Sequence, residues 1–182
     1  MSTGQLEGSS SRPYGICWDL GDVIFDEATE LKTPEGVTEQ VVLVPGVGEL
    51  LRSLAGRGIP MAIVSDTRIG ACENVLGPHE LAGCFRHHTI SEAIGVEKPD
   101  PAMFLVTSQA LAIPLGRLAM VGNNYERDVV GARAVGMAAI WFCWNDRYPV
   151  PDPAPAADYV ARDAAELATV IDDWIATLDA TC

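Results

Sequence analysis

Tyr14-Gly15-Ile16-Cys17-Trp18-Asp19-Leu20-Gly21-Asp22-Val23 is the stretch that decides the fold. Its apolar residues predict a short buried strand, and Gly21 frees the backbone for a turn just after Asp19. Asp19 would then stand at the carboxyl end of that strand, the edge at which open α/β sheets bind ligands. Asp19 is therefore a candidate nucleophile or metal ligand, although an aspartate after a strand more commonly caps the following turn.

Apolar runs alternate with amphipathic stretches along the rest of the chain. Further strands are predicted at residues 59–64, 85–90, 118–121, 138–142 and 159–160. Helices are predicted at residues 45–56, 69–76, 102–111, 131–136 and 164–178. The alternation predicts right-handed βαβ units, and therefore an α/β fold in which a doubly wound parallel sheet carries helices on both faces. The acidic segment 26–40 fits either a β-hairpin or a loop.

Composition limits the partners and the location of the protein. The chain has 182 residues and a formal net charge of −13, which argues against nucleic acid and anionic membranes as partners. Residues 1–13 are predicted to be a flexible tail rather than a signal peptide, and residues 14–182 a single domain in which 149–155 form a stiff linker. No stretch is long and apolar enough to cross a bilayer. We expect a cytoplasmic protein without a membrane partner.

Cysteine and histidine positions give no sign of a zinc site or a disulfide framework. The five cysteines contain no CxxC pair, and their scatter through apolar segments predicts buried thiols in a reducing compartment. The histidines His79, His87 and His88 match no compact set of metal ligands.

Polar side chains follow several of the predicted strands. Ser65 and Asp66 come after one, Asn123 and Asp128 after another, and Lys98 lies in a loop stiffened by prolines. Singly, each has a structural explanation as a helix cap, a turn residue or a solvated charge. Because the carboxyl ends of parallel strands share one edge of the sheet, their common placement indicates a site.

Four motifs, in order, carry a resemblance to a known family. They are Asp19-Leu20-Gly21-Asp22-Val23, Ile63-Val64-Ser65-Asp66-Thr67, Gly95-Val96-Glu97-Lys98-Pro99-Asp100-Pro101, and Val121-Gly122-Asn123-Asn124 continuing through Asp128 to Gly131-Ala132. The segment from about Tyr14 to Ala164 resembles the haloacid dehalogenase superfamily of hydrolases. The resemblance implies the Rossmann-like core of that family.

The resemblance also implies a mechanism, in which Asp19 attacks phosphorus and forms an aspartyl-phosphate with the help of Mg²⁺. The catalytic residues that it implies are Asp19, Ser65, Lys98 and Asp22. The implied phosphate-binding residues are Leu20, Gly21, Ser65, Asp66 and Lys98, and the implied Mg²⁺ ligands are Asp19, Gly21 through its carbonyl, Asn123 and Asp128. The substrate would be a phosphorylated small molecule or an exposed phosphoryl group on a larger one.

The sequence departs from the family pattern at two positions. Most family phosphatases have an aspartate two residues after the nucleophile, as acid and base, whereas this chain has Gly21 there and Asp22 one residue later. The usual metal-binding aspartate of the fourth motif is Asn123, so we expect weaker binding of Mg²⁺. Only about 45 residues separate Asp19 from Ser65, which leaves no room for a sizeable cap domain, and the site should be open.

Three functions follow from this pattern. The first is a Mg²⁺-dependent phosphomonoester hydrolase. The second, which Gly21 and Asn123 favour, is a degenerate family member that binds a phospho-ligand or a protein partner without efficient turnover. The third is a metal-free hydrolase of the 2-haloacid dehalogenase type, which also lacks the second aspartate but needs an enclosed apolar pocket.

Overall fold

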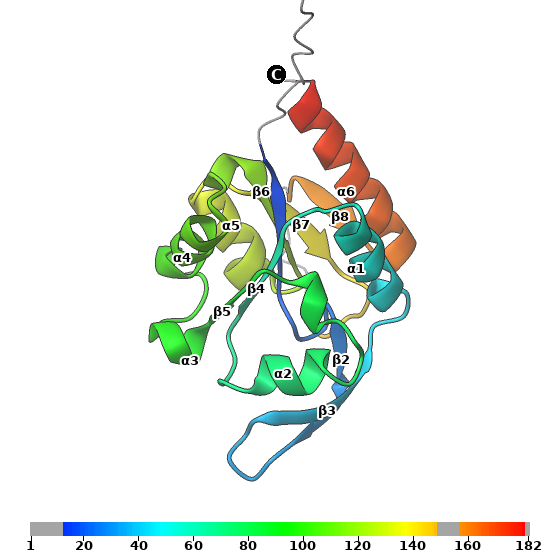
Figure 1. The fold of residues 1–182 in the computed structure, drawn as a ribbon, viewed down its shortest axis with the longest axis vertical. Helices are drawn as coiled ribbons and strands as arrows, with labels where there is room; N and C mark the ends of the chain where they lie inside the picture. The colour runs from blue at the N-terminus through cyan, green and yellow to red at the C-terminus, as the bar shows by residue number, and fades with distance from the viewer. Residues whose placement is uncertain (1–12, 149–156, 181–182) are drawn as a thin grey trace, which may run out of the picture.

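The computed structural model describes residues 13–148 and 157–180. Within these ranges, six strands form one sheet in the spatial order β5-β4-β1-β6-β7-β8, and every neighbouring pair is parallel (Figure 1). The strands are β1 (Gly15–Trp18), β4 (Met61–Ser65), β5 (His87–Ile90), β6 (Leu118–Gly122), β7 (Ala138–Phe142) and β8 (Tyr159–Ala161). Strand β1, the first strand in the described residues, lies in the middle of the sheet, between β4 and β6.

Helices cover both faces of the sheet, which confirms the doubly wound prediction (Figure 1). On one face, α1 (Val47–Gly56), α2 (Ala71–Leu76) and α6 (Ala164–Asp179) contribute to a core that includes Trp18, Leu51 and Ile171. On the other face, α4 (Pro101–Leu111), the π-helical segment η3 (Tyr125–Val130) and α5 (Gly131–Ala134) contribute to a core that includes Phe104 and Met120. Because β1 is buried on both faces, its sequence is a continuous apolar run rather than an alternating one.

The acidic segment after β1 forms a hairpin rather than a loop. Strand β2 (Phe25–Lys32) pairs antiparallel with β3 (Thr38–Leu43) in a separate two-stranded sheet, which extends away from the main sheet (Figure 1). In the described residues, the chain between Asp19 and Lys98 holds no cap domain, only this hairpin and the elements of the core. The hairpin therefore contributes to the wall of the site in place of a cap domain.

Smaller elements complete the architecture. The structure has a short helix, α3 (Ser91–Ile94), in a segment where the sequence analysis predicts no helix, and two short 3₁₀ helices, η1 (Ala82–Cys84) and η2 (Leu115–Arg117). Of the cysteines, Cys17 and Cys72 are buried, Cys84 and Cys143 are partly exposed, and these four are free thiols. Most of the predicted tail, the predicted linker and Cys182 lie outside the described residues.

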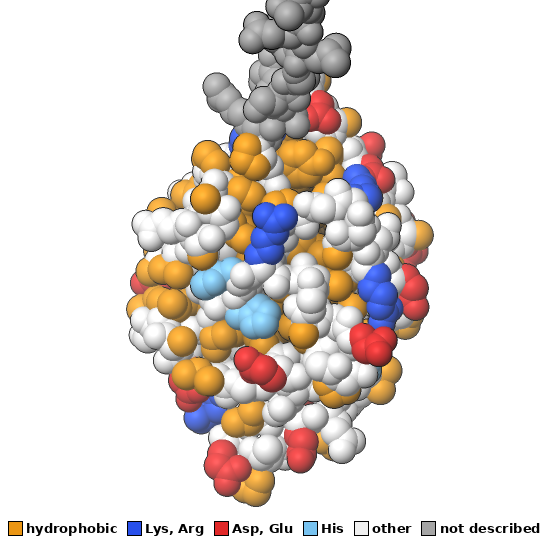
Figure 2. Space-filling view, in the orientation of Figure 1, with side chains coloured by type: hydrophobic (Ala, Val, Ile, Leu, Met, Phe, Trp, Pro, Cys, Tyr) orange, Lys and Arg blue, Asp and Glu red, His pale blue; other side chains and the backbone are white. Residues whose placement is uncertain are grey.

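The surface shows no gathering of positive charge on the face in Figure 2, where the Lys and Arg side chains lie singly among other side chains. No helix within the described ranges has the length and apolar character needed to cross a membrane.

Candidate active site

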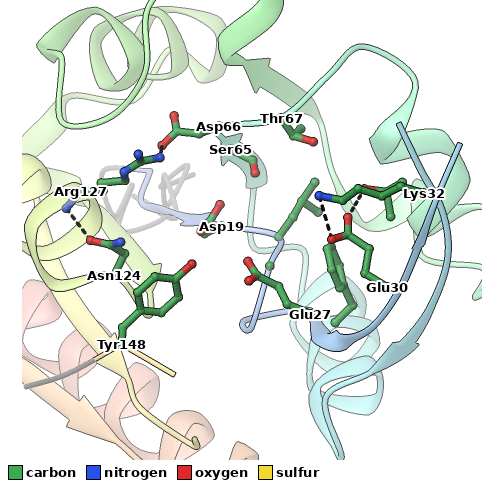
Figure 3. Close-up of a pocket in the computed structure, with 14 residues that line it drawn as sticks. Asp19, Glu27, Glu30, Lys32, Ser65, Asp66, Thr67, Asn124, Arg127 and Tyr148 are labelled. Carbon is green, nitrogen blue, oxygen red and sulfur yellow. Dashed lines mark hydrogen bonds and ion pairs between the residues drawn. The ribbon is translucent and has the colours of Figure 1, made fainter. Parts of the chain in front are cut away.

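The polar residues at the strand ends meet at one edge of the sheet, as the sequence predicts. Asp19 follows β1, and its backbone N–H donates to the carbonyl of Val121 in β6 at 3.0 Å. Ser65 is the last residue of β4, the neighbour of β1 on its other side. A cavity of about 280 Å³ opens here (Figure 3), and its lining is mostly polar: Asp19, Leu20, Gly21, Phe25, Glu27, Glu30, Lys32, Thr38, Ser65, Asp66, Thr67, Asn124, Arg127 and Tyr148.

Lys98 joins two carboxylates at the base of this edge. Its ammonium Nζ lies 3.0 Å from Asp19 Oδ1 and 2.7 Å from Asp128 Oδ1, and its side chain is 1% exposed. Burial lowers the pKa of Lys98, but the carboxylates of Asp128 and Asp19 raise it by more, and the pKa lies above its usual range. Lys98 is therefore a fixed positive charge beside the carboxylate of Asp19.

Asp128 forms the shorter of the two ion pairs with Lys98. Its Oδ2 accepts from the backbone N–H of Asn124 at 3.0 Å, and its Oδ1 faces Lys98. Burial raises the pKa of Asp128 to about 6, against the opposing effect of Lys98. Gly122 makes room for the carboxylate, because a Cβ at that position would lie 2.2 Å from the Cβ of Asp128. Both oxygens of Asp128 thus have partners within the protein.

Asp66 holds the Lys98 loop against the end of β4. Its Oδ1 accepts from the backbone N–H of Lys98 at 2.8 Å, and its Oδ2 lies 3.1 Å from the guanidinium of Arg127. Burial raises the pKa of Asp66, while Lys98 and Arg127 oppose that effect. The carboxylate of Asp66 thus links the Lys98 loop to Arg127 beside the cavity.

Asp22 does not line the cavity. It is fully buried with a positive φ of 49°, and its carboxylate forms an ion pair with Arg147. The same carboxylate accepts from the backbone N–H of Glu27 at 3.0 Å, and the Asp22 carbonyl accepts from the indole N–H of Trp144 at 2.8 Å. The structure therefore gives Asp22 contacts that fasten the base of the hairpin, in place of the predicted contact with a substrate.

Glu27 is one of several cavity residues that the sequence analysis does not predict, and it is the one whose carboxylate lies beside Gly21. It lies in β2, and Figure 3 shows its carboxylate and the hydroxyl of Tyr148 pointing into the space beside Asp19. Burial raises the pKa of Glu27, the negative charge of Asp22 raises it further, and Arg147 opposes the shift. The signal available in the sequence was a glycine in the nucleophile motif followed by an acidic hairpin, but only the folded hairpin brings the two together.

The oxygen donors near Asp19 fit a weakly held Mg²⁺ ion. Among the described residues, no group of three or more His, Cys, Asp or Glu side chains forms a metal site. The two oxygens of the Asp128 carboxylate already contact Lys98 and the backbone N–H of Asn124. The oxygen donors that remain for a metal ion are the carboxylate of Asp19, the carbonyl of Gly21 and the side-chain amide of Asn123. Asn123 is 6% exposed, and its buried amide nitrogen has no hydrogen-bond partner among the described residues, but this NH₂ group is a donor and only the amide oxygen could bind a metal ion. Mg²⁺ commonly has few protein ligands and takes the rest from water and substrate phosphate.

A family model for haloacid dehalogenase-like hydrolases matches residues 15–136, which include all four motifs. The chain belongs to the haloacid dehalogenase-like hydrolases. Among its relatives, glyceraldehyde 3-phosphate phosphatase of Pyrococcus furiosus is 33% identical over 132 residues, which are 71% of this chain and 54% of the relative. (S)-2-haloacid dehalogenase H-109 of Pseudomonas putida is 34% identical over 97 residues, which are 53% of this chain and 43% of the relative.

Solved structures of haloacid dehalogenase-like proteins share the fold. A superfamily hydrolase from Ehrlichia chaffeensis superposes with a TM-score of 0.72 at 15% identity, over 92% of this chain and 100% of that one. The chain spans about half the length of the two curated relatives above. Family membership therefore covers both phosphatases and dehalogenases, and the chemistry of this chain has to be argued from its own site.

Proposed function

We propose that this haloacid dehalogenase-like protein hydrolyses phosphomonoesters through an aspartyl-phosphate on Asp19. The observation that carries the proposal is that Asp19, which lines the polar cavity, lies 3.0 Å from the buried ammonium of Lys98. A carboxylate can act as the nucleophile, and a buried cation next to it stabilises the negative charge that a phosphoryl group carries in the transition state.

The remaining motif residues would bind the phosphoryl oxygens. Ser65 ends the neighbouring strand and lines the same cavity, so its hydroxyl can donate to one oxygen. The backbone amides of Leu20, Gly21 and Asp66 follow the two strand ends and can donate to the others. Asp128 would keep Lys98 charged and in place without touching the substrate.

Mg²⁺, when bound, would supply charge neutralisation to the phosphoryl group. Asp19, the carbonyl of Gly21 and the amide oxygen of Asn123 would hold it. We infer weak binding, because Asn123 offers a neutral oxygen and Asp128 is engaged with Lys98.

The lining of the cavity favours a phosphate ester over a haloacid. Dehalogenation of a carbon centre needs a pocket that excludes water, whereas this cavity is bordered by charged side chains such as Glu30, Lys32 and Arg127. A phosphorylated small molecule, or a phosphoryl group exposed on a larger substrate, fits a polar entrance without a cap domain.

The test is release of phosphate by the purified full chain from para-nitrophenyl phosphate and a panel of phosphorylated metabolites, with and without Mg²⁺. We expect Mg²⁺-stimulated turnover that Asp19→Asn abolishes, because an amide cannot form the aspartyl-phosphate. Thermal unfolding of Asp19→Asn should remain cooperative, which separates loss of chemistry from loss of fold. Halide release from a 2-haloacid without phosphatase activity would contradict the proposal, and binding of phosphate esters without turnover would favour the degenerate binder.

A further inference from the structure

The carboxylate of Glu27 occupies the space that a side chain at position 21 would fill. A Cβ built on Gly21 would lie 2.1 Å from Glu27 Oε1, 2.9 Å from its Cδ and 3.0 Å from its Cγ. Gly21 is not among the glycines with positive φ, so its backbone would accept an ordinary side chain. Because position 21 has no side chain, the carboxylate of Glu27 can lie beside it in the wall of the cavity.

Glu27 is also the carboxylate near Asp19 that is least engaged with the rest of the protein. Asp22, Asp66 and Asp128 each form a close ion pair with an arginine or a lysine, and Glu30 pairs with Lys32 at 3.0 Å. The nearest cation to the Glu27 carboxylate among the described residues is Arg147, at 3.7 Å. No hydrogen bond from a described residue reaches either of its oxygens, so this carboxyl group is available to a bound molecule.

The backbone around Glu27 is fixed although its carboxylate is not. Its N–H donates to Asp22 Oδ1 at 3.0 Å, and Asp22 is held in turn by Arg147 and by the indole of Trp144. The side chain of Glu27 is 31% exposed and projects toward Asp19 from the hairpin (Figure 3). A carboxyl group on a fixed backbone, facing the nucleophile across an open cavity, has the geometry of a group that meets the leaving group.

We propose that Glu27 is a catalytic residue that exchanges a proton with the leaving group and then with water. As Asp19 Oδ bonds to phosphorus and the ester P–O bond breaks, the proton of the Glu27 carboxyl passes to the departing oxygen. Water then attacks the aspartyl-phosphate, its proton passes to the Glu27 carboxylate, and the bond from phosphorus to Asp19 breaks. This assignment rests on the proposed phosphatase function and names the group that completes it.

Leaving-group dependence tests the proposal. Glu27→Gln keeps the size of the side chain but cannot donate or accept the proton in this way. We expect kcat for glycerol phosphate, whose leaving group needs a proton, to fall by about 10²-fold or more, the typical contribution of a positioned acid or base. With para-nitrophenyl phosphate, whose leaving group departs as a stable anion, the variant should release a burst of nitrophenolate equal to the enzyme present and then slow down. The matched control is Glu39→Gln, an exposed glutamate in strand β3 of the same hairpin that does not line the cavity, and it should change the two substrates by the same small factor.

Moving the carboxylate provides the second test. Glu27→Ala should lose activity as Glu27→Gln does, and it empties the space beside Gly21. The double variant Gly21→Asp/Glu27→Ala places a carboxylate back into that space from the other side, and we expect it to regain most of the turnover of glycerol phosphate. Gly21→Asp alone should lower activity, because the new side chain and Glu27 compete for one place.

The outcomes separate this inference from the proposed function. If the unmutated protein hydrolyses no phosphate ester, that result alone overturns the proposed function. If the unmutated protein is active but Glu27→Gln retains its rate, only the proposed role of Glu27 is overturned. The same conclusion follows if Glu27→Gln lowers the rates with both substrates equally and shows no burst. A cooperatively folded double variant no more active than Glu27→Ala would also overturn it.

Discussion

The ammonium of Lys98 lies between the carboxylates of Asp19 and Asp128, so on the proposed function its charge would serve both stability and activity. Lys98→Met leaves the buried Asp128 carboxylate unpaired, and we expect a loss of about 3–5 kcal/mol in the free energy of unfolding. We also expect turnover to fall by about 10²-fold or more. Denaturant titration and steady-state kinetics measure the two effects.

A second substitution separates these two roles of Lys98. In Lys98→Met/Asp128→Asn the buried charge is removed together with its partner, so stability should recover while activity stays low. Arg127→Met is the control for the loss of a positive charge, because Arg127 lines the same cavity but its side chain is half-exposed rather than buried. Recovery of activity in the double variant would show that Lys98 has only a structural role.

Asn123 is the residue at which affinity for Mg²⁺ can be changed. Asn123→Asp adds a charged oxygen to the proposed donor set, and we expect a lower Mg²⁺ concentration for half-maximal rate. Asn124→Asp is a suitable control, since it adds the same charge at the adjacent position and an aspartate keeps the cap that Asn124 provides to Arg127 N–H. Equal shifts in both variants would indicate a general effect of charge rather than a ligand at position 123.

Among the elements, the β2–β3 hairpin depends on Asp22 for its position. Asp22→Ala removes the acceptor of the Glu27 N–H and the partner of Arg147. We expect it to lower stability by about 1.5–3 kcal/mol, the usual contribution of a hydrogen bond to a charged group. Hydrogen exchange should quicken first at the amides of the hairpin.

Asp22→Asn provides the comparison for that prediction. Asparagine tolerates the positive φ of this position and can still accept from the Glu27 N–H, so its effect should be smaller. If both variants lose turnover of glycerol phosphate without any change in hairpin exchange, Asp22 acts on the substrate after all.

The sequence predicted the elements of the main sheet better than the hairpin, for a physical reason. Strands such as β4 and β6 are buried on both faces, so they are unbroken apolar runs that stand out from their surroundings. The residues of β2 after Phe25 are half-buried or exposed and mostly polar, because the hairpin extends beyond the main core. Its pattern therefore fitted a loop equally well.

The residues of the candidate site show the same difference between the main sheet and the hairpin. The sequence could place Asp19, Ser65 and Lys98 at one edge because the first two follow or end apolar strands and the third lies in a proline-containing loop, and topology brings such positions together. Glu27 was not found, since its place depends on how the hairpin folds back over Gly21. Asp22, although it belongs to the first motif, turns away into the protein through a positive φ that no residue pattern specifies.

For the molecule as a whole, the buried thiols report on global unfolding. Burial raises the pKa of Cys17 and of Cys72 to about 12, so both remain protonated at ordinary pH, and only the thiolate reacts. In a Cys182→Ser background, we expect thiol reagents to label Cys84 and Cys143 in the native protein, and Cys17 and Cys72 only at the rate of unfolding. Mass spectrometry of labelled peptides measures this, and rapid native labelling of Cys17 would contradict a tightly packed central strand.

The contact between Gly21 and Glu27 also has an evolutionary consequence. On the proposal for Glu27, neither residue is useful without the other: a larger side chain at position 21 would expel the glutamate, and the glycine alone would leave the site without its proton donor. The two positions should therefore be inherited as a pair and should covary among descendants of a common ancestor. A lineage that regains an aspartate at position 21 should then be free to lose the glutamate from its hairpin.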